Sequence, residues 1–250
     1  MSASPRSFAF GFVGLGNMGS QMARNLATYA EQNGLPAVRV WNRTRSKIEP
    51  LAQEANCEIV SSLEEVAEKC DVVHTCLAND LVALSVYRQF FSTKSAGTIL
   101  VDHSTLYHTT AVTLQTEAAQ VGMHYLSCPV FGPPAAAKSA QLLVVLSGDA
   151  ASRDLVRQYI VPTIGKGALD AGEDASQGAL MKLLGNNCIL GTIELLSESF
   201  TLAEKTGFDV SLFYEFIRTF PMLHDLVTLL THIRTMVPHC PLGQLRQEDP

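Results

Sequence analysis

A glycine-rich turn near the N-terminus constrains this chain more than any other feature. The stretch GFVGLGNMGSQMARNL, from Gly11 to Leu26, leads from an apolar, strand-like run through three spaced glycines into a helical pattern. These glycines form G-x-G-x-x-G at a strand-to-helix junction, where they allow a tight turn, a close approach of a pyrophosphate and close helix packing. A helix N-terminus also favours an anion. The predicted dinucleotide contacts are Gly14, Leu15, Gly16, Asn17, Met18 and Gly19.

Strand-like and helix-like stretches alternate from this turn to about residue 146. The expected strands are 8–13, 37–41, 58–60, 71–76, 98–101, 123–128 and 142–146, and the expected helices are 18–32, 45–55 and others that begin near Ser62, Asp80, Tyr107 and Pro134. Such alternation predicts βαβ units. The fold class is therefore α/β, a Rossmann-type doubly wound parallel sheet with helices on both faces.

The sequence changes character from Asp174 onward. Between residues 177 and 206 there is no strand pattern, and apolar residues recur at helical spacing up to Gly207. Shorter helical stretches follow at 210–219 and 222–236, before a polar tail. We therefore expect a dinucleotide-binding domain over 8–173, and over 174–250 a long helix and a short all-α part for substrate binding and dimerisation.

The end of the second expected strand predicts which dinucleotide is bound. An NAD site places a carboxylate there for the ribose 2′-hydroxyl, but the residues after Trp41 read N-R-T-R and include no acid. A 2′-phosphate would instead meet the Arg43 guanidinium and the side chains of Asn42 and Thr44, and Arg45 would add charge. The predicted cofactor is NADP(H).

Composition excludes several classes of partner. The net charge is −6 and no stretch is dense in Lys or Arg, so a nucleic-acid partner is not expected. We find neither a targeting pattern nor an apolar run long enough to span a bilayer, and we expect a cytoplasmic protein without a membrane partner. The cysteines form no C-x-x-C pair and the histidines no H-x-x-x-H pair, so reduced thiols and no metal site are expected.

Four ordered motifs resemble the β-hydroxyacid dehydrogenases, the family of 3-hydroxyisobutyrate dehydrogenase and 6-phosphogluconate dehydrogenase. They are GLGNMG followed by QMARNL, DHST at 102–105, CPVFG at 128–132 and GALMKLLGNN at 178–187. The resemblance runs from about Phe8 to about Gly207. It implies that Ser104 and Thr105 lie near the nicotinamide, that 128–132 is a substrate loop, and that 178–187 carries the catalytic lysine. Further cofactor contacts are expected from Leu77 and Ala78, after the strand 71–76.

The lysine segment also makes chemical sense on its own. Lys182 and Asn186 are four residues apart, and so they share one face of the expected helix. A lysine beside a substrate hydroxyl can accept its proton as hydride leaves for the nicotinamide, and can return it in the reverse direction. Apolar neighbours over 179–184 favour partial burial, which lowers the pKa of a lysine. The expected catalytic residues are Lys182 and Asn186, and the expected substrate contacts are Ser104, Phe131, Gly132, Lys182 and Asn186.

The chain departs from the family pattern in two places. Many relatives read P-V-S-G-G where this chain has Phe131, Gly132 and Pro133, so a serine hydroxyl and a backbone N–H that would grip a carboxylate are replaced. Phe131 either fills space or favours a more apolar substrate. The helical part, 174–250, is also shorter than in the family, so a partner subunit supplies the missing cover or the site is open to water. An exposed apolar helix face would favour a homodimer.

Three functions are compatible with the sequence. The first is an NADP(H)-dependent oxidoreductase that transfers hydride between nicotinamide and a small β-hydroxy acid, aldehyde acid or related carbonyl compound, with Lys182 as general acid/base. The second is C=N reduction of the imine reductase type, which the lysine disfavours. The third is a catalytically impaired NADP-binding subunit.

Overall fold

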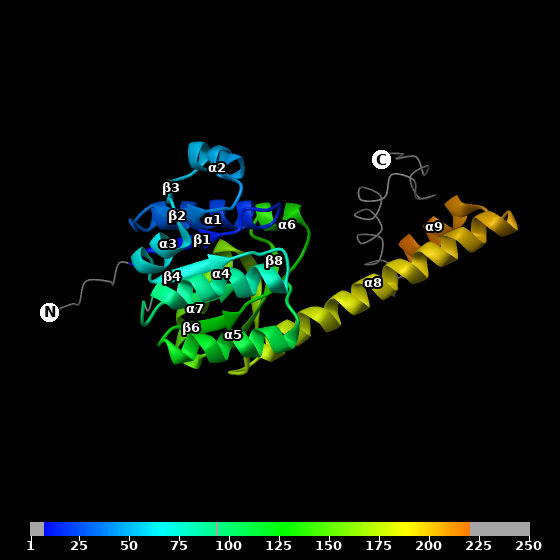
Figure 1. Cartoon of the computed structure of the whole chain (residues 1–250). Helices are drawn as coiled ribbons and strands as arrows, with labels where there is room; N and C mark the ends of the chain where they lie inside the picture. Colours follow the sequence, from blue (N-terminus) through cyan, green and yellow to red (C-terminus); the bar gives the residue numbers. More distant parts are fainter. Residues whose placement is uncertain (1–7, 94, 221–250) are drawn as a thin grey trace. The chain divides into compact units, whose positions relative to one another are not determined.

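The computed structural model describes residues 8–93 and 95–220 (Figure 1). The strands are β1 Phe10–Val13, β2 Val38–Trp41, β3 Cys57–Ile59, β4 Val72–Thr75, β5 Ile99–Asp102, β6 His124–Ser127, β7 Val130–Phe131, β8 Leu142–Gly148 and β9 Gly165–Asp170. The helices are α1 Gly19–Gln32, α2 Glu49–Glu54, α3 Leu63–Lys69, α4 Asp80–Thr93, α5 His108–Gln120, α6 Pro134–Lys138, α7 Ala150–Thr163, α8 Ala175–Thr206 and α9 Val210–Thr219, with a 3₁₀ turn η1 at Arg45–Lys47.

The sheet confirms the predicted α/β, Rossmann-type fold. Its first six strands are parallel and lie in the order β3-β2-β1-β4-β5-β6. The prediction of a parallel sheet is wrong for the next strands, because β8 runs antiparallel to β6 and β7 and pairs in parallel only with β9. Only the short helix α6 separates β7 from β8, and parallel neighbours need a longer crossover.

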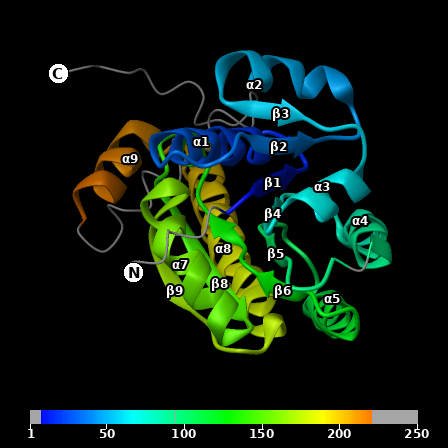
Figure 2. The same cartoon turned by 90° about the vertical axis from the view of Figure 1, so that its left-hand side faces the viewer.

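Helices cover both faces of the sheet, because side chains alternate along each strand. Phe10 and Phe12 share one buried cluster with residues of α1, α6 and α7, and Val13 shares the other with residues of α3, α4 and α5. Figure 2 shows α1 and α7 on one side of the strands and α3, α4 and α5 on the other. Because both faces are buried, a ligand can approach the parallel strands at their ends, where the loops follow them.

Several predicted elements differ in detail from the observed ones. The expected helix 45–55 is divided into η1 and α2, and Pro50 lies in the first turn of α2. The strands β7 and β9 and the helix α7 were not expected. The long helix α8 begins at Ala175, and α9 has the predicted bounds. The expected helix 222–236 lies outside the described residues.

The chain forms two compact units, Met1–Leu183 and Leu184–Pro250, and α8 runs through the boundary between them. The sequence-based boundary at 173/174 stays a prediction. Within the described residues, α8 is long and apolar enough, by length and composition, to cross a membrane. The expectation of a chain without a membrane partner stays a prediction. Core helices of soluble proteins can have the same length and composition.

Two buried histidines form a chain of hydrogen bonds beneath the sheet's carboxyl edge. The Nδ1 of His103 lies 2.8 Å from the carbonyl oxygen of Cys128, and because a carbonyl only accepts, this nitrogen carries the proton. The Nε2 of His103 then accepts from His74 Nδ1 at 2.9 Å, and His74 Nε2 accepts from the Tyr159 hydroxyl at 2.9 Å. Both rings are therefore neutral. Burial lowers the pKa of His103 to about 4 and holds the pKa of His74 well below its usual range.

We expect these histidines to make the fold acid-sensitive. In the unfolded chain an imidazole takes up a proton near its ordinary pKa of about 6.5, whereas His103 in the folded chain stays neutral down to about 4. The stability that depends on neutral His103 is thus present above the unfolded pKa and is lost as pH falls below it. Urea unfolding should show a loss of about 2 kcal/mol between about pH 7 and about pH 5 from this group.

The variant His103→Gln has no proton to take up in this range, and we expect a flatter dependence of unfolding free energy on pH. Equal slopes for wild type and His103→Gln would contradict this explanation.

Candidate functional site

The glycine turn between β1 and α1 has the geometry of a phosphate-binding loop. Gly14 has a φ of +93°, and a Cβ there would overlap the carbonyl of Cys76. A Cβ on Gly19 would overlap the carbonyl of Gly14, so α1 meets β1 without space for a side chain. Gly16 differs, because a Cβ there meets nothing within 4 Å. Its backbone therefore faces open space, where a pyrophosphate can approach it.

The first residues of α1 also favour the binding of a phosphate. The residue before the helix, Met18, makes no capping hydrogen bond with its side chain, and the first turn of α1 contains no acidic residue. Within the described part of the chain, no acceptor is assigned to the N–H groups of Gly16 and Asn17. Unsatisfied N–H groups at the positive end of a helix bind anions.

Asn42 has a role that the sequence did not predict. Its Oδ1 accepts a hydrogen bond from the N–H of Leu15 at 2.9 Å, and its Nδ2 donates to the carbonyl of Thr44 at 2.9 Å. The amide thus joins the glycine turn to the loop after β2. Contact between Asn42 and a 2′-phosphate stays a prediction, and the side chain already has two partners.

The rest of the loop after β2 is positive and exposed. Arg43, Thr44 and Arg45 are solvent-exposed, and within residues 8–93 and 95–220 no ion pair is formed by Arg43 or Arg45. Their charges are therefore not neutralised by neighbouring carboxylates. The loop lies beside the glycine turn, since Gly14 donates to the carbonyl of Trp41 at 3.2 Å. A phosphate on the ribose of a bound dinucleotide would meet this positive charge.

At the ends of β4 and β5 a buried carboxylate arranges the next predicted residues. Asp102 accepts from the Thr75 hydroxyl at 3.0 Å, from the Ser104 N–H at 2.9 Å and from the Tyr125 hydroxyl at 3.0 Å. Burial raises the pKa of this carboxyl group, while these donors oppose the rise. The hydroxyl of Ser104 in turn accepts from the N–H of Leu77 at 2.7 Å. The sequence motif contained Asp102, but nothing in the pattern indicated its burial.

The structure therefore brings together several predicted site residues. Leu77, Ala78 and Ser104 follow neighbouring parallel strands, and so they lie at the same edge of the sheet as the glycine turn. Ser104 is buried, whereas Thr105 is exposed. The hydroxyl of Ser104 is occupied by Leu77, so its first role here is to hold the loop after β4. Its contact with nicotinamide or substrate stays a prediction.

Lys182 lies against the aromatic ring of Phe131. The ammonium nitrogen is 4.3 Å from the ring centroid, a cation–π contact between α8 and β7. The side chain is half-buried, and burial lowers the pKa of Lys182. Within the described residues no carboxylate pairs with it. The amine is therefore partly dehydrated and has no counter-ion, as a lysine that exchanges protons with a substrate requires.

The apolar neighbours of Lys182 differ in burial. Leu180, Met181 and Leu184 are exposed, whereas Ala179 is buried, and the ring of Phe131 contacts the amine. Gly132, which follows Phe131, has a φ of +136° and no space for a Cβ, since Leu142 would lie 2.7 Å from it. Asn186 lies one helical turn after Lys182 on α8, as expected, and is half-buried; its catalytic role stays a prediction.

Comparison with known proteins identifies the family of this chain. A family model described as the NAD binding domain of 6-phosphogluconate dehydrogenase matches residues 9–172. An NADH-dependent oxidoreductase of Aspergillus ustus is 30% identical over 82% of this chain and 69% of its own length. A chloroplastic glyoxylate/succinic semialdehyde reductase of Arabidopsis thaliana is 30% identical over 84% of this chain and 57% of its own length, so the chain spans less than two thirds of that relative.

A solved structure supports the same relationship. The 3-hydroxyisobutyrate dehydrogenase of Mycobacterium tuberculosis, determined with L-serine, superimposes with a TM-score of 0.74 at 25% identity. The match covers 86% of this chain and 71% of that one. The region matched by the family model, residues 9–172, contains the glycine turn, the Asp102 network and Phe131.

The open space at Gly16 generates a test of the binding loop. Gly16→Ala should fold normally but weaken dinucleotide binding by about tenfold or more, because its Cβ occupies the space of the pyrophosphate. Gly14→Ala should lower the thermal midpoint of unfolding, because it forces a left-handed φ and overlaps Cys76. Calorimetry and a titration monitored through the fluorescence of Trp41 measure the two effects. Similar behaviour of the two variants would argue against separate roles for these glycines.

Proposed function

The chain belongs to the β-hydroxyacid dehydrogenase family, and from this premise we propose that it is an NADP(H)-dependent oxidoreductase with Lys182 as general acid/base. Its substrates are small β-hydroxy acids, aldehyde acids or related carbonyl compounds. The observation that carries the proposal is the half-buried ammonium of Lys182, which has no carboxylate partner among the described residues and follows the dinucleotide-binding domain directly.

The chemistry needs one proton carrier beside the transferred hydride. A bound nicotinamide would supply the hydride acceptor for oxidation of the alcohol carbon and the hydride donor for reduction of the carbonyl. Neutral Lys182 takes the hydroxyl proton at Nζ as the C=O bond forms. In reduction the ammonium returns this proton to the carbonyl oxygen. Asn186, one turn later on α8, would hydrogen-bond the same oxygen or orient the lysine.

The preference for NADP(H) rests on charge. Asn42, Arg43 and Thr44 follow β2, where an NAD site would have a carboxylate, and Arg43 is exposed without an ion pair in the described residues. One relative is named as NADH-dependent, and so the preference of this chain needs its own measurement. The name of another relative, glyoxylate/succinic semialdehyde reductase, supports the proposal of aldehyde acids as substrates.

Phe131 indicates which substrates the site would prefer. Its ring covers Lys182 where many relatives have a serine, so an apolar wall lies beside the proton carrier. We expect substrates whose group on this side is apolar to be turned over better than those with a second carboxylate.

The remaining proposals concern the oligomeric state, the location and the ligands of the chain. Exposed apolar residues recur along α8, including Leu190, Leu195 and Leu202, and a second copy of the chain is the partner we propose for them. A cytoplasmic location is proposed, and neither nucleic acid nor a membrane is a proposed partner. Small carbonyl or hydroxy-acid compounds are the proposed ligands besides the cofactor.

Replacement of Lys182 tests the catalytic proposal. Lys182→Ala should lower kcat by about a hundredfold or more on any substrate found in a carbonyl screen, and should leave NADPH affinity unchanged. Lys205→Ala is the matched control, an exposed lysine later on α8, and should behave as wild type. Full turnover by Lys182→Ala would refute the assignment, and turnover of cyclic imines alone would favour C=N reduction.

The pH dependence follows from the lowered pKa of Lys182. Reduction needs the charged amine, and so kcat/KM should fall as pH rises through a midpoint below the ordinary lysine value of about 10.4. Oxidation should show the opposite limb at the same midpoint. If Lys182→Ala keeps residual activity and shows neither of these two pH dependences, both are due to the amine of Lys182.

Replacement of Arg43 tests the cofactor proposal. Arg43→Ala should weaken NADPH binding by about tenfold and change NADH binding little, because only NADPH carries the 2′-phosphate. Lys47→Ala, in the same exposed segment, is the matched control. Fluorescence quenching of Trp41 reports both titrations. An equal loss for NADPH and NADH would contradict the assignment of Arg43 to the phosphate.

A further inference from the structure

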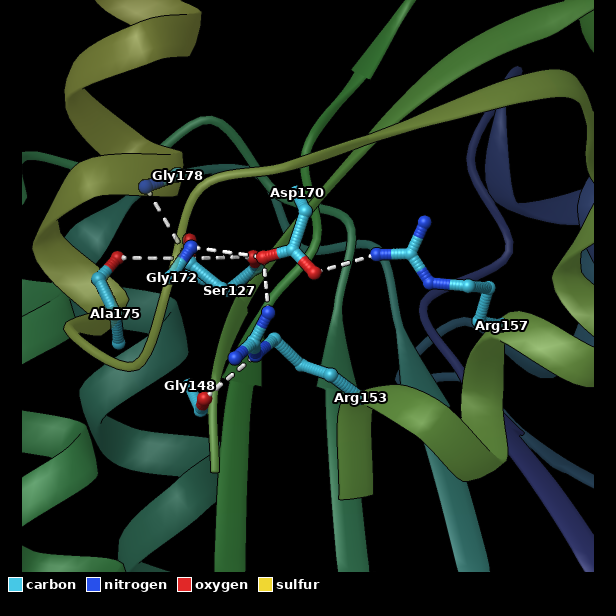
Figure 3. A network of polar contacts seen from close by, with 9 residues as sticks. Ser127, Gly148, Arg153, Arg157, Asp170, Gly172, Ala175 and Gly178 are labelled. Carbon is cyan, nitrogen blue, oxygen red and sulfur yellow. Dashed lines mark hydrogen bonds and ion pairs between the residues drawn. The ribbon is translucent and has the colours of Figure 1, made fainter. Parts of the chain in front are cut away.

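A single buried hydroxyl joins the strand before the substrate loop to the helix that carries Lys182. Ser147 of β8 is fully buried, and its Oγ lies 3.0 Å from the carbonyl of Ser127 and 3.3 Å from the carbonyl of Ala175. The same oxygen accepts from the N–H of Gly178 at 3.1 Å. Figure 3 shows Ser127 of β6 beside Ala175 and Gly178 in the first turns of α8.

Gly178 is packed too closely at this junction to carry a side chain. A Cβ on Gly178 would overlap the Ser147 hydroxyl and would lie 2.8 Å from the carbonyl oxygen of Ser127. The first turns of α8 therefore lie against the ends of β6 and β8 at backbone distance. A helix held at this point has its next turn fixed as well, because backbone hydrogen bonds make successive turns rigid.

The loop that enters α8 is fixed on its other side. Asp170 pairs with Arg153 and, at 2.6 Å, with Arg157, and it accepts from the N–H of Gly172 at 2.9 Å. Arg153 also donates to the carbonyl of Gly148 at 2.9 Å (Figure 3). The loop before α8 is thus bound to β8 and α7 while the helix itself is bound through Ser147.

The backbone groups that Ser147 binds are close in sequence to Lys182 and Phe131, the two residues of the cation–π contact. Lys182 lies one helical turn after Gly178, and Phe131 lies four residues after Ser127. Each partner of the cation–π contact is thus one short segment from a group that the Ser147 hydroxyl binds. We propose that Ser147 is a positioning residue, which sets the amine of Lys182 against the ring of Phe131. Its effect on catalysis rests on the proposed role of Lys182.

The geometry distinguishes this role from ordinary packing. A buried serine that only satisfied its own hydroxyl would need one acceptor. Ser147 instead bridges β6 and α8: its one proton points to the carbonyl of Ser127 at 3.0 Å, with the carbonyl of Ala175 farther away at 3.3 Å, and its oxygen accepts from the N–H of Gly178. Without the hydroxyl, the contact between α8 and β6 loses its only polar bridge among the described residues, and a displacement near 1 Å at a catalytic group costs about a hundredfold in rate.

The test measures Lys182 directly and does not need a known substrate. The full chain is labelled with trace acetic anhydride over a range of pH, and mass spectrometry gives the pH midpoint for acetylation of Lys182, with exposed Lys166 as internal reference. In Ser147→Ala we expect the midpoint to rise by about half a unit, because a lysine released from partial burial regains its ordinary pKa. On a substrate from the screen, kcat should fall about tenfold while KM for NADPH is unchanged.

Controls separate positioning from loss of stability. Ser152→Ala removes another buried hydroxyl, which donates to Asp149 and does not contact α8, and should leave the Lys182 midpoint unchanged. Gly178→Ala should shift the midpoint as Ser147→Ala does, whereas Gly191→Ala, with no atom within 4 Å of the added Cβ, should not. If Ser147→Ala does not fold, Ser147→Cys, with a weaker acceptor of similar shape, makes the same comparison.

The outcomes are decisive in each case. An unchanged midpoint in folded Ser147 and Gly178 variants would overturn the proposal, whatever the activity. A shifted midpoint together with full turnover by Lys182→Ala would instead support the positioning role of Ser147 and refute the catalytic role of the lysine.

Discussion

The close approach of α1 to β1 at the glycine turn is the constraint on which the rest of the site depends. Gly19 meets the carbonyl of Gly14 without space for a Cβ, and Gly14 itself meets the carbonyl of Cys76 at the end of β4. The N-terminus of α1 is thereby held at the carboxyl edge of the central strands. The backbone at Gly16 remains open above it. A phosphate-binding position follows from packing, because a larger residue at either crowded glycine would move the helix away.

Buried polar groups then connect this edge strand by strand. Asp102 joins β4, β5 and β6 through Thr75, the Ser104 N–H and Tyr125. On the other face of the sheet, His103 binds the carbonyl of Cys128, and Ser147 continues the connection from β6 to α8. Each group is fully hydrogen-bonded where water is excluded, and a satisfied buried network specifies one arrangement of its backbone. The loops that would surround the nicotinamide are thus set by the interior beneath them.

Local patterns predicted the parts of the fold that local physics determines. The glycine spacing, the strand alternation and the bounds of α9 were all readable, because each depends on neighbouring residues. The reversal of β8 was not, since strand direction depends on pairing between distant segments. Similarly, Lys182 was predicted from its motif, whereas its contact with Phe131 joins residues far apart in the chain. Asn42 was assigned to a phosphate from its place after β2, and its hydrogen bond to Leu15, which joins distant segments, had no sequence signature.

The ring of Phe131 has two opposed effects on one amine. The ring excludes water from Lys182, and burial lowers the pKa of this lysine. The face of the same ring is negative and attracts the charged form, which opposes that shift. A serine at this position would exclude less water and offer no such face. The ring can thus hold the lysine without a hydrogen bond from a polar side chain at this position, provided that α8 keeps the amine over the ring. That condition is met by backbone contacts at Gly178, which do not depend on the charge of the lysine.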